Sequence, residues 1–175
     1  VVDGITFAAH AGDVVALTGP NGSGKTTLLE ALLGWLPVAG GGCAPAPGQW
    51  PSPFGYSPAS AVSVTTEITL LDEVTTYRPP GLSLAAVFER LAEFGLPAAD
   101  LRVQLSDSPP HRKLASVLST ILLARPVLLL DEPTLLLAPP HQEIVRAAIR
   151  AATASAIIVA SHDDGFISSL RGLVM

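Results

Sequence analysis

The stretch "GPNGSGKTT", residues 19–27, decides the fold that this sequence predicts. Its spacing, G-x-x-x-x-G-K-[ST], is that of a phosphate-binding loop (P-loop). The apolar run "DVVALT" before it is typical of a buried strand, and "KTTLLEALLGW" predicts a helix closed by Gly34. Between these elements, the glycines let successive backbone N–H groups point at phosphate oxygens, at the positive end of the helix dipole. A glycine-rich turn that binds nothing is the alternative, and the flanking elements disfavour it.

The candidate nucleotide-binding residues all come from this loop and the start of its helix. They are Gly19, Pro20, Asn21, Gly22, Ser23, Gly24, Lys25, Thr26 and Thr27. Lys25 supplies a positive charge for the β- and γ-phosphates of a nucleotide, and the Thr26 hydroxyl is a predicted ligand of Mg²⁺.

Polar residues also end two further predicted strands. "VLLLDEP" carries Asp131, a predicted Mg²⁺ ligand either directly or through water, and Glu132, predicted to orient and deprotonate the attacking water. "AIIVASH" ends at His162, predicted to sense the γ-phosphate by a hydrogen bond. Taken alone, an Asp-Glu pair after a strand is more often a helix N-cap than a catalytic pair. A lone histidine at the end of a strand is as often a capping residue as a functional one. The P-loop favours the catalytic interpretation of Glu132 and His162.

The rest of the chain alternates predicted helices with predicted strands. Ser83 can cap a helix that ends at Gly95, a second helix precedes "VLLLDEP", and a third lies between the two strands just named. The apolar residues of the first helix recur at helical spacing: Leu84, Val87, Phe88, Leu91 and Phe94. This alternation predicts an α/β fold with a mainly parallel sheet flanked by helices on both faces.

Two segments give weaker signals. In residues 37–58, 11 of 22 residues are Gly or Pro, which favours irregular backbone or short edge strands. The final "GLVM" is typical of the start of another strand.

The composition indicates one domain over residues 1–175, because 49% of its residues are hydrophobic and its mean hydropathy is +0.47. The apolar runs are too short to predict a transmembrane segment, "VVDGITF" lacks the layout of a signal peptide, and Cys43 has no second cysteine to pair with. We therefore expect a cytoplasmic location. The net charge is −5 and the only lysines are Lys25 and Lys113, so we expect no patch for direct contact with nucleic acid.

Together these motifs resemble the nucleotide-binding domain of ATP-binding cassette (ABC) proteins over essentially the whole chain. The family's order is present: the P-loop, "GYSP", "LS" at 105–106, Glu132 after a strand, then "SHD". The resemblance implies a P-loop NTPase fold with a helical subdomain at about residues 68–125 and a reduced antiparallel β part. It also implies an ATPase that uses ATP and Mg²⁺. Its partner would be a second cassette, from the same chain or another, paired head to tail so that each signature helix caps the other's ATP.

The sequence departs from the family pattern at several positions. Ala59 stands where the family has a glutamine, and Ala138 where it has an aspartate. The signature Leu-Ser-Gly-Gly-Gln is degenerate: after Leu105 come Ser106, Asp107, Ser108 and Pro109. The family's adenine-stacking aromatic residue lies upstream of the first residue, so we expect the domain to be incomplete at its N-terminus.

The degenerate signature has a physical consequence. Proline has no N–H to offer a phosphate, although it fits the first turn of a helix. Asp107 adds a negative charge that repels a like unit charge at roughly 5 Å by about 3 kcal/mol at an effective dielectric near 20. That energy corresponds to about a hundredfold in affinity. We hypothesise that this cassette binds ATP in its own P-loop but caps a partner's ATP poorly; the alternative is a solvated helix start with Asp107 and Ser108 as caps.

Three functional interpretations remain open at this point. Phrases such as "LLARPVLLLDEPT" resemble most the second cassette of ABC-F proteins, ribosome-associated ATPases of which some confer antibiotic resistance. The alternative is the nucleotide-binding subunit of an ABC transporter, with a membrane permease as partner. The third is a regulatory cassette that binds nucleotide without turnover, which Ala59, Ala138 and the degenerate signature favour.

Overall fold

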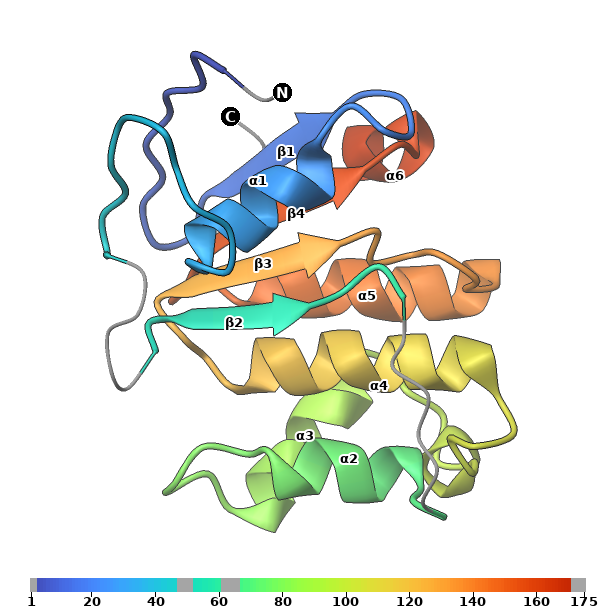
Figure 1. Cartoon of the computed structure of the whole chain (residues 1–175). Helices are drawn as coiled ribbons and strands as arrows, with labels where there is room; N and C mark the ends of the chain where they lie inside the picture. The colour runs from blue at the N-terminus through green and yellow to red at the C-terminus, as the bar shows by residue number, and fades with distance from the viewer. Residues whose placement is uncertain (1–2, 47–51, 61–66, 171–175) are drawn as a thin grey trace.

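The computed structural model describes residues 3–46, 52–60 and 67–170. Four strands form one sheet in the order β1 (Val14–Thr18), β4 (Ala156–Ser161), β3 (Val127–Asp131) and β2 (Phe54–Ser57). Every neighbouring pair is parallel, so the carboxyl ends of all four strands lie at one edge (Figure 1). The prediction of a parallel sheet is confirmed.

Helices cover both faces of the sheet, as predicted (Figure 1). Successive side chains of a strand point to opposite faces. Leu129 and Ile158 therefore pack with Leu29 of α1 (Lys25–Leu32), whereas Leu128 and Ile157 join the larger cluster on the other face. That larger cluster is shared with α4 (Pro109–Leu122), α5 (Pro139–Ala151) and α6 (Asp164–Ser169).

A helical region lies on the far side of α4 from the sheet (Figure 1). It contains α2 (Leu70–Thr76), α3 (Leu84–Glu93) and the short 3₁₀ helix η1 (Asp100–Arg102). Helix α3 begins as predicted, because the Ser83 side chain accepts a hydrogen bond from the Ala86 N–H, and Gly95 follows its end at φ 84°. The boundaries of a subdomain at residues 68–125 stay a prediction.

One detail of α3 differs from the sequence prediction. Val87, Leu91 and Phe94 are buried, but Leu84 and Phe88 are 48% and 42% exposed. The buried residues follow one row of the helix at spacings of four and three, and the two exposed residues form the neighbouring row. The packed face of α3 is therefore narrower than its apolar pattern, since only one row faces the core.

The proline- and glycine-rich segment contributes a strand of the main sheet. Phe54–Ser57 forms β2 at the edge of the sheet, where the prediction allowed short edge strands. The described residues form no antiparallel β part: their antiparallel pairing is an isolated bridge between Thr69 and Gln104, in the helical region. The strand suggested by "GLVM" lies outside the described residues. No helix in the described ranges is long and apolar enough to cross a membrane.

Gly55 sets how closely α4 approaches β2. A Cβ at this position would lie 3.0 Å from Leu128 Cδ2 and 3.3 Å from Thr120 Cγ2. Thr120 lies in α4, and its hydroxyl donates a hydrogen bond to the Tyr56 carbonyl at 3.3 Å. The missing side chain therefore lets helix and strand pack directly on one another.

We predict that Gly55→Ala lowers the free energy of unfolding by about 1–3 kcal/mol, because the added methyl group overpacks the contact between α4 and β2. Urea denaturation followed by circular dichroism measures the change. Gly40→Ala is the matched control, since a Cβ at Gly40 meets no atom within 4 Å. Equal stability of the two variants would contradict the close-packing argument.

Candidate functional site

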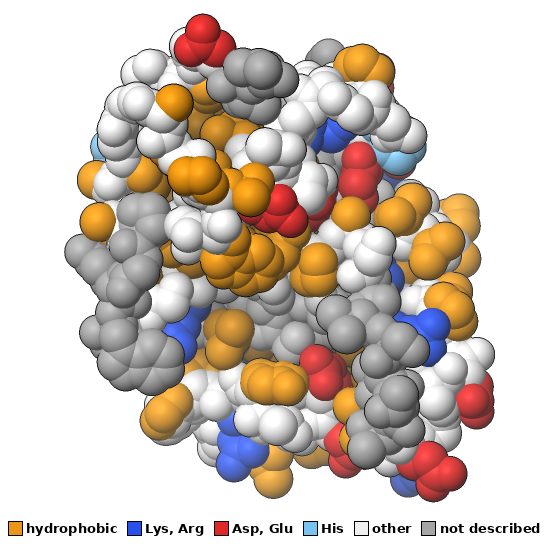
Figure 2. All heavy atoms as spheres, in the orientation of Figure 1, with side chains coloured by type: hydrophobic (Ala, Val, Ile, Leu, Met, Phe, Trp, Pro, Cys, Tyr) orange, Lys and Arg blue, Asp and Glu red, His pale blue; other side chains and the backbone are white. Residues whose placement is uncertain are grey.

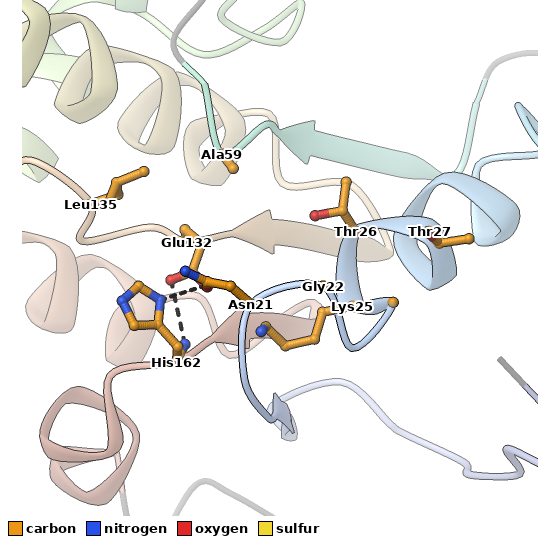
Figure 3. Close-up of a pocket in the computed structure, with 10 residues that line it drawn as sticks. Asn21, Gly22, Lys25, Thr26, Thr27, Ala59, Glu132, Leu135 and His162 are labelled. Atoms are coloured by element: carbon orange, nitrogen blue, oxygen red, sulfur yellow. Dashed lines mark hydrogen bonds and ion pairs between the residues drawn. The ribbon is translucent and has the colours of Figure 1, made fainter. Parts of the chain in front are cut away.

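A cavity of about 360 Å³ opens at the carboxyl ends of the strands (Figure 3). In open parallel sheets this edge is where ligands bind. Its lining comes from the P-loop and from the loops after β2, β3 and β4: Asn21, Gly22, Gly24, Lys25, Thr26, Thr27, Ala59, Glu132, Leu135 and His162. Residues far apart in the sequence thus meet where the P-loop was predicted to hold a nucleotide.

The P-loop has the backbone that its glycines predict. Gly22 and Gly24 adopt φ values of 80° and 95°, in the left-handed region that other residues rarely occupy. A Cβ at Gly22 would meet no atom within 4 Å, so this side of the loop is open to the cavity. The Lys25 ammonium donates hydrogen bonds to the carbonyls of Gly19 at 2.7 Å and Pro20 at 3.2 Å, which holds its charge over the loop.

Thr26 and Asp131, the two predicted Mg²⁺ ligands, are in direct contact. The Thr26 hydroxyl donates to Asp131 Oδ2 at 2.7 Å, and the second carboxylate oxygen, Oδ1, is buried with no hydrogen-bond partner among the described residues. Burial raises the pKa of the Asp131 carboxyl, and the Thr26 hydrogen bond and the Lys113 ammonium oppose that shift. A hydroxyl beside a carboxylate with an unused oxygen fits the oxygen ligands that Mg²⁺ takes.

Glu132 and His162 form a pair at the edge of the cavity (Figure 3). His162 Nδ1 lies 2.8 Å from Glu132 Oε1, and Oε2 accepts hydrogen bonds from the Ser161 hydroxyl at 3.2 Å and the His162 N–H at 3.4 Å. Glu132 also has φ 46°, a conformation that is strained for a residue with a side chain. The end of β3 therefore holds this carboxylate in one orientation, and such strain is common at functional sites.

Lys113 is a buried contact that the sequence analysis missed. Its side chain is fully buried in α4, and its ammonium donates to the carbonyls of Asp131 at 2.7 Å and Pro58 at 2.6 Å. Burial lowers the pKa of Lys113 to about 8, and the carboxylates of Asp131 and Glu132 oppose the shift. This ammonium joins α4 to the end of β3 and to the loop after β2, next to the cavity-lining residues Ala59 and Glu132.

The sequence matches the family described as ABC transporter over residues 2–135. The chain belongs to this ABC family. It is 36% identical to the zinc import ATP-binding protein ZnuC of Ruegeria pomeroyi over 170 residues, covering 93% of this chain and 63% of that protein. The hemin import ATP-binding protein HmuV of Nocardia farcinica is 36% identical over 187 residues, covering 97% of this chain and 64% of that protein. The chain thus spans less than two thirds of the length of these relatives.

A third relative and two solved structures extend the comparison. The cytochrome c biogenesis ATP-binding export protein CcmA of Rhodobacter capsulatus is 30% identical over 175 residues, covering 99% of this chain and 79% of that protein. A structure titled as the ATP binding subunit of an ABC transporter aligns with TM-score 0.75 and 25% identity over 99% of this chain and 76% of its own. A putative ABC transporter ATP-binding protein from Pyrococcus furiosus aligns with TM-score 0.77 over 91% and 83% of the two chains; at 21% identity it supports the fold alone.

These comparisons correct one interpretation of the sequence. The relatives named above are transport ATP-binding proteins, so the resemblance to the second cassette of ABC-F proteins has no support from them. One of the phrases that suggested it, "LLARPVLLLDEPT", contains the strand that ends at Asp131. Since ABC cassettes in general share that motif, it does not separate one branch of the family from another.

The signature segment of this ABC cassette lies at the start of α4 and does not line the cavity. Ser108 occupies the N-cap position, but its hydroxyl makes no capping bond and instead lies 2.6 Å from His111 Nδ1. Asp107 is exposed, and its carboxylate accepts a hydrogen bond from the Ser106 hydroxyl at 3.0 Å. Side-chain capping by Asp107 and Ser108, the alternative considered above, is therefore not observed.

Sequence reasoning also missed Leu135, which lines the cavity from the loop after β3. Its position gave no chemical signal, because leucine carries no polar group. Lys113 did carry one: it is one of two lysines and lies a helical turn before Val117, on the apolar face of α4. A lysine on that face predicts a buried ammonium that needs partners.

We predict that the stability conferred by Lys113 rises with pH. Its folded pKa of about 8 lies below the usual 10.5, so the unfolded chain binds more protons between these values and the free energy of unfolding increases there. Relative to Lys113→Met, the wild type should gain about 2 kcal/mol between about pH 7 and pH 10. Urea denaturation across this pH range measures the difference.

Lys25→Met is the matched control, because it removes the other lysine and leaves Lys113 in place. It should keep the pH dependence of the wild type, whatever its absolute stability. If the free energy of unfolding changed with pH in the same way for the wild type and for Lys113→Met, burial would not lower the pKa of the Lys113 ammonium, and this prediction would be wrong.

Proposed function

We propose that this ABC cassette binds Mg-ATP in the cavity and hydrolyses it when paired with a second cassette, as the nucleotide-binding part of an ABC transporter. One observation carries the proposal: the P-loop, the Thr26–Asp131 contact and the Glu132–His162 pair meet at one edge of the sheet. These are the parts that phosphoryl transfer to water needs.

Each residue has a distinct role in this proposal. P-loop N–H groups and Lys25 bind the phosphates, and Thr26 and Asp131 are the protein ligands of Mg²⁺, which neutralises phosphate charge when bound. Glu132 accepts a proton from the attacking water. His162 orients the γ-phosphate, and its hydrogen bond to Glu132 positions that carboxylate.

The transporter assignment rests on the relatives, and an exposed loop supports pairing with a second cassette. The relatives are named for zinc import, hemin import and export in cytochrome c biogenesis, so transport is common to them while the cargo differs. Leu135 and Leu136, between Glu132 and α5, are 38% and 60% exposed beside the cavity. Apolar side chains at this position favour burial against a partner cassette.

A regulatory cassette is the second candidate, and Ala59 favours it. Ala59 lines the cavity where the family has a glutamine, and a methyl group offers Mg²⁺ no oxygen. This candidate differs from the first in one measurable property: ATP binds without turnover under every pairing condition. On the face drawn in Figure 2, Lys and Arg side chains form small separate groups, so this face presents no broad basic patch for ribosomal RNA.

We predict that Glu132→Gln keeps nucleotide binding and lowers hydrolysis by about 10²–10⁴-fold, because the amide cannot accept the proton of the attacking water. Phosphate release and the fluorescence of a bound ATP analogue measure the two properties. Glu89→Gln on the exposed side of α3 is the control and should match the wild type in both. Undetectable turnover in the wild type, alone or with candidate partner cassettes, would favour the regulatory candidate.

The same Glu132→Gln variant also tests the partner. Blocked hydrolysis should hold the closed complex together, so a tagged variant is expected to co-sediment with membranes from a cell lysate when ATP is present. Lys25→Met combined with Glu132→Gln is the control, since loss of phosphate binding should release the complex. Recovery with ribosomes would overturn the transporter proposal, and recovery with neither would favour the regulatory one.

We predict that Asp107→Asn strengthens ATP-dependent pairing of the Glu132→Gln cassette by up to about a hundredfold, because it removes a negative charge facing the partner's phosphates. Asp3→Asn is the charge-matched control on an exposed segment. Analytical ultracentrifugation with ATP measures pairing. Restoring glycine at 107 and 108 and glutamine at 109 should add to the effect; no change in either variant would contradict the charge-repulsion hypothesis.

A further inference from the structure

The sequence "PPH" occurs twice, at residues 109–111 and 139–141, and each copy opens a helix. Proline suits the first turn of a helix because its missing N–H has no helical partner there. Each pair of prolines therefore places its histidine in the first turn of a helix, His111 in α4 and His141 in α5. Because α4 and α5 lie side by side on the same face of the sheet, the two rings meet, with centroids 5.1 Å apart (Figure 1).

Asp100 of η1 faces both rings. His141 Nε2 lies 2.9 Å from Asp100 Oδ2, and His111 Nε2 lies 3.8 Å from Asp100 Oδ1. Each of the three residues offers one ligand atom, and these atoms all lie within 4.8 Å of one another. Among the described residues this is the group of histidine and carboxylate side chains that could hold a metal ion. The three side chains are only 17–18% exposed.

The cluster contains buried nitrogen atoms that lack hydrogen-bond partners. His111 Nε2 and His141 Nδ1 are buried and unpartnered among the described residues. A buried polar atom without a partner destabilises the fold, and a bound ligand or ion can relieve this. His111 Nδ1 is already engaged by the Ser108 hydroxyl at 2.6 Å. When Nδ1 carries the proton and donates it to Ser108, the lone pair is left on Nε2, which lies on the side of Asp100.

We propose that Asp100, His111 and His141 form a binding site for a divalent transition metal ion of the Zn²⁺ class. Neutral imidazole and carboxylate are ligands that Zn²⁺ prefers, whereas Mg²⁺ prefers oxygen ligands alone. Ligand atoms around tetrahedral Zn²⁺ at about 2.0 Å lie about 3.3 Å apart. The two His–Asp distances run to different oxygens of Asp100, and one ligand atom from each residue lies within 4.8 Å of the others, so the three side chains need only close slightly around the ion. Three protein ligands leave a fourth position for water, and Ser108 is the residue that orients His111.

The charges around the cluster of Asp100, His111 and His141 favour binding of one cation rather than several. The first turns of α4 and α5 carry partial positive charge, which disfavours a cation. The Asp100 carboxylate offsets this charge, and the low exposure of the cluster strengthens its attraction to a bound ion. We therefore expect one ion, bound with loss of any proton shared between His141 and Asp100.

A bound ion would join three separate segments of the chain. It would tie η1 and the first turns of α4 and α5 together, and through Ser108 it would hold the end of the degenerate signature segment, residues 106–109. None of its ligands lines the cavity at the P-loop, so the two sites are distinct. Metal binding at this site is separate from the proposed function and is measured without nucleotide.

The test is metal binding by the full chain, washed with chelator and kept in excess Mg²⁺ to saturate oxygen ligands. Isothermal titration with Zn²⁺ should give one equivalent bound, and Co²⁺ should produce visible d–d absorption without a thiolate charge-transfer band. His111→Ala, His141→Ala and Asp100→Asn should each lose this binding. Ser108→Ala should weaken it by about 10- to 100-fold. His10→Ala is the control, because His10 is 84% exposed and lies outside the cluster.

Several outcomes would overturn the proposal. They are the absence of saturable Zn²⁺ binding by the wild type, undiminished binding by the double variant His111→Ala, His141→Ala, and a thiolate band that vanishes in Cys43→Ser. The Co²⁺ spectrum of the wild type keeps the test decisive if a variant fails to fold, since a site without nitrogen ligands would leave the spectrum of aqueous Co²⁺ unchanged. Zn²⁺ should also raise the melting temperature of the wild type and leave that of the Asp100→Asn variant unchanged.

Discussion

The buried carboxyl end of β3 is the constraint on which the rest of this cassette depends. Asp131 accepts the Thr26 hydroxyl through its side chain and the Lys113 ammonium through its backbone carbonyl. These two bonds fix the start of α1 and the first half of α4 to the same residue, from opposite faces of the sheet. Burial of a carboxylate and an ammonium is costly unless both are well bonded. Removing either contact would leave a polar group buried without a partner, so the two faces are held in register.

This arrangement links the signature segment to the nucleotide cavity through one helix. Lys113 is four residues beyond Pro109, and its second bond reaches the Pro58 carbonyl immediately before Ala59. A shift of α4 along its axis would therefore displace the backbone at the ends of both β2 and β3. The strained backbone of Glu132 follows directly on Asp131, which makes the orientation of that carboxylate sensitive to the same contacts.

The sequence alone predicted the parts of this structure that depend on local chemistry. The P-loop, the strand ending in Asp131 and the Ser83 cap were predictable because spacing, apolar pattern and capping each act within a few residues. The partners of Lys113 and the meeting of Asp100 with His111 and His141 were not, since only the packing of distant segments decides them. The exposure of Leu84 and Phe88 has the same origin. The apolar stripe of a helix shows which residues are available for burial, but the elements packed against the helix determine how many of them are buried.

The degenerate signature and the histidine cluster are parts of one local structure, which changes how the substitutions in this segment are understood. A family-type signature presents glycine N–H groups to a phosphate, whereas here the first turn of α4 begins with two prolines and the Ser108 hydroxyl is held by His111. The prolines remove donors, but they also set the turn that carries His111 toward Asp100. Simple decay of a phosphate-binding turn explains the lost donors and leaves the second "PPH" at α5 unexplained. In the proposed metal site the two copies have the same role, since each pair of prolines starts the helical turn whose histidine lies against Asp100.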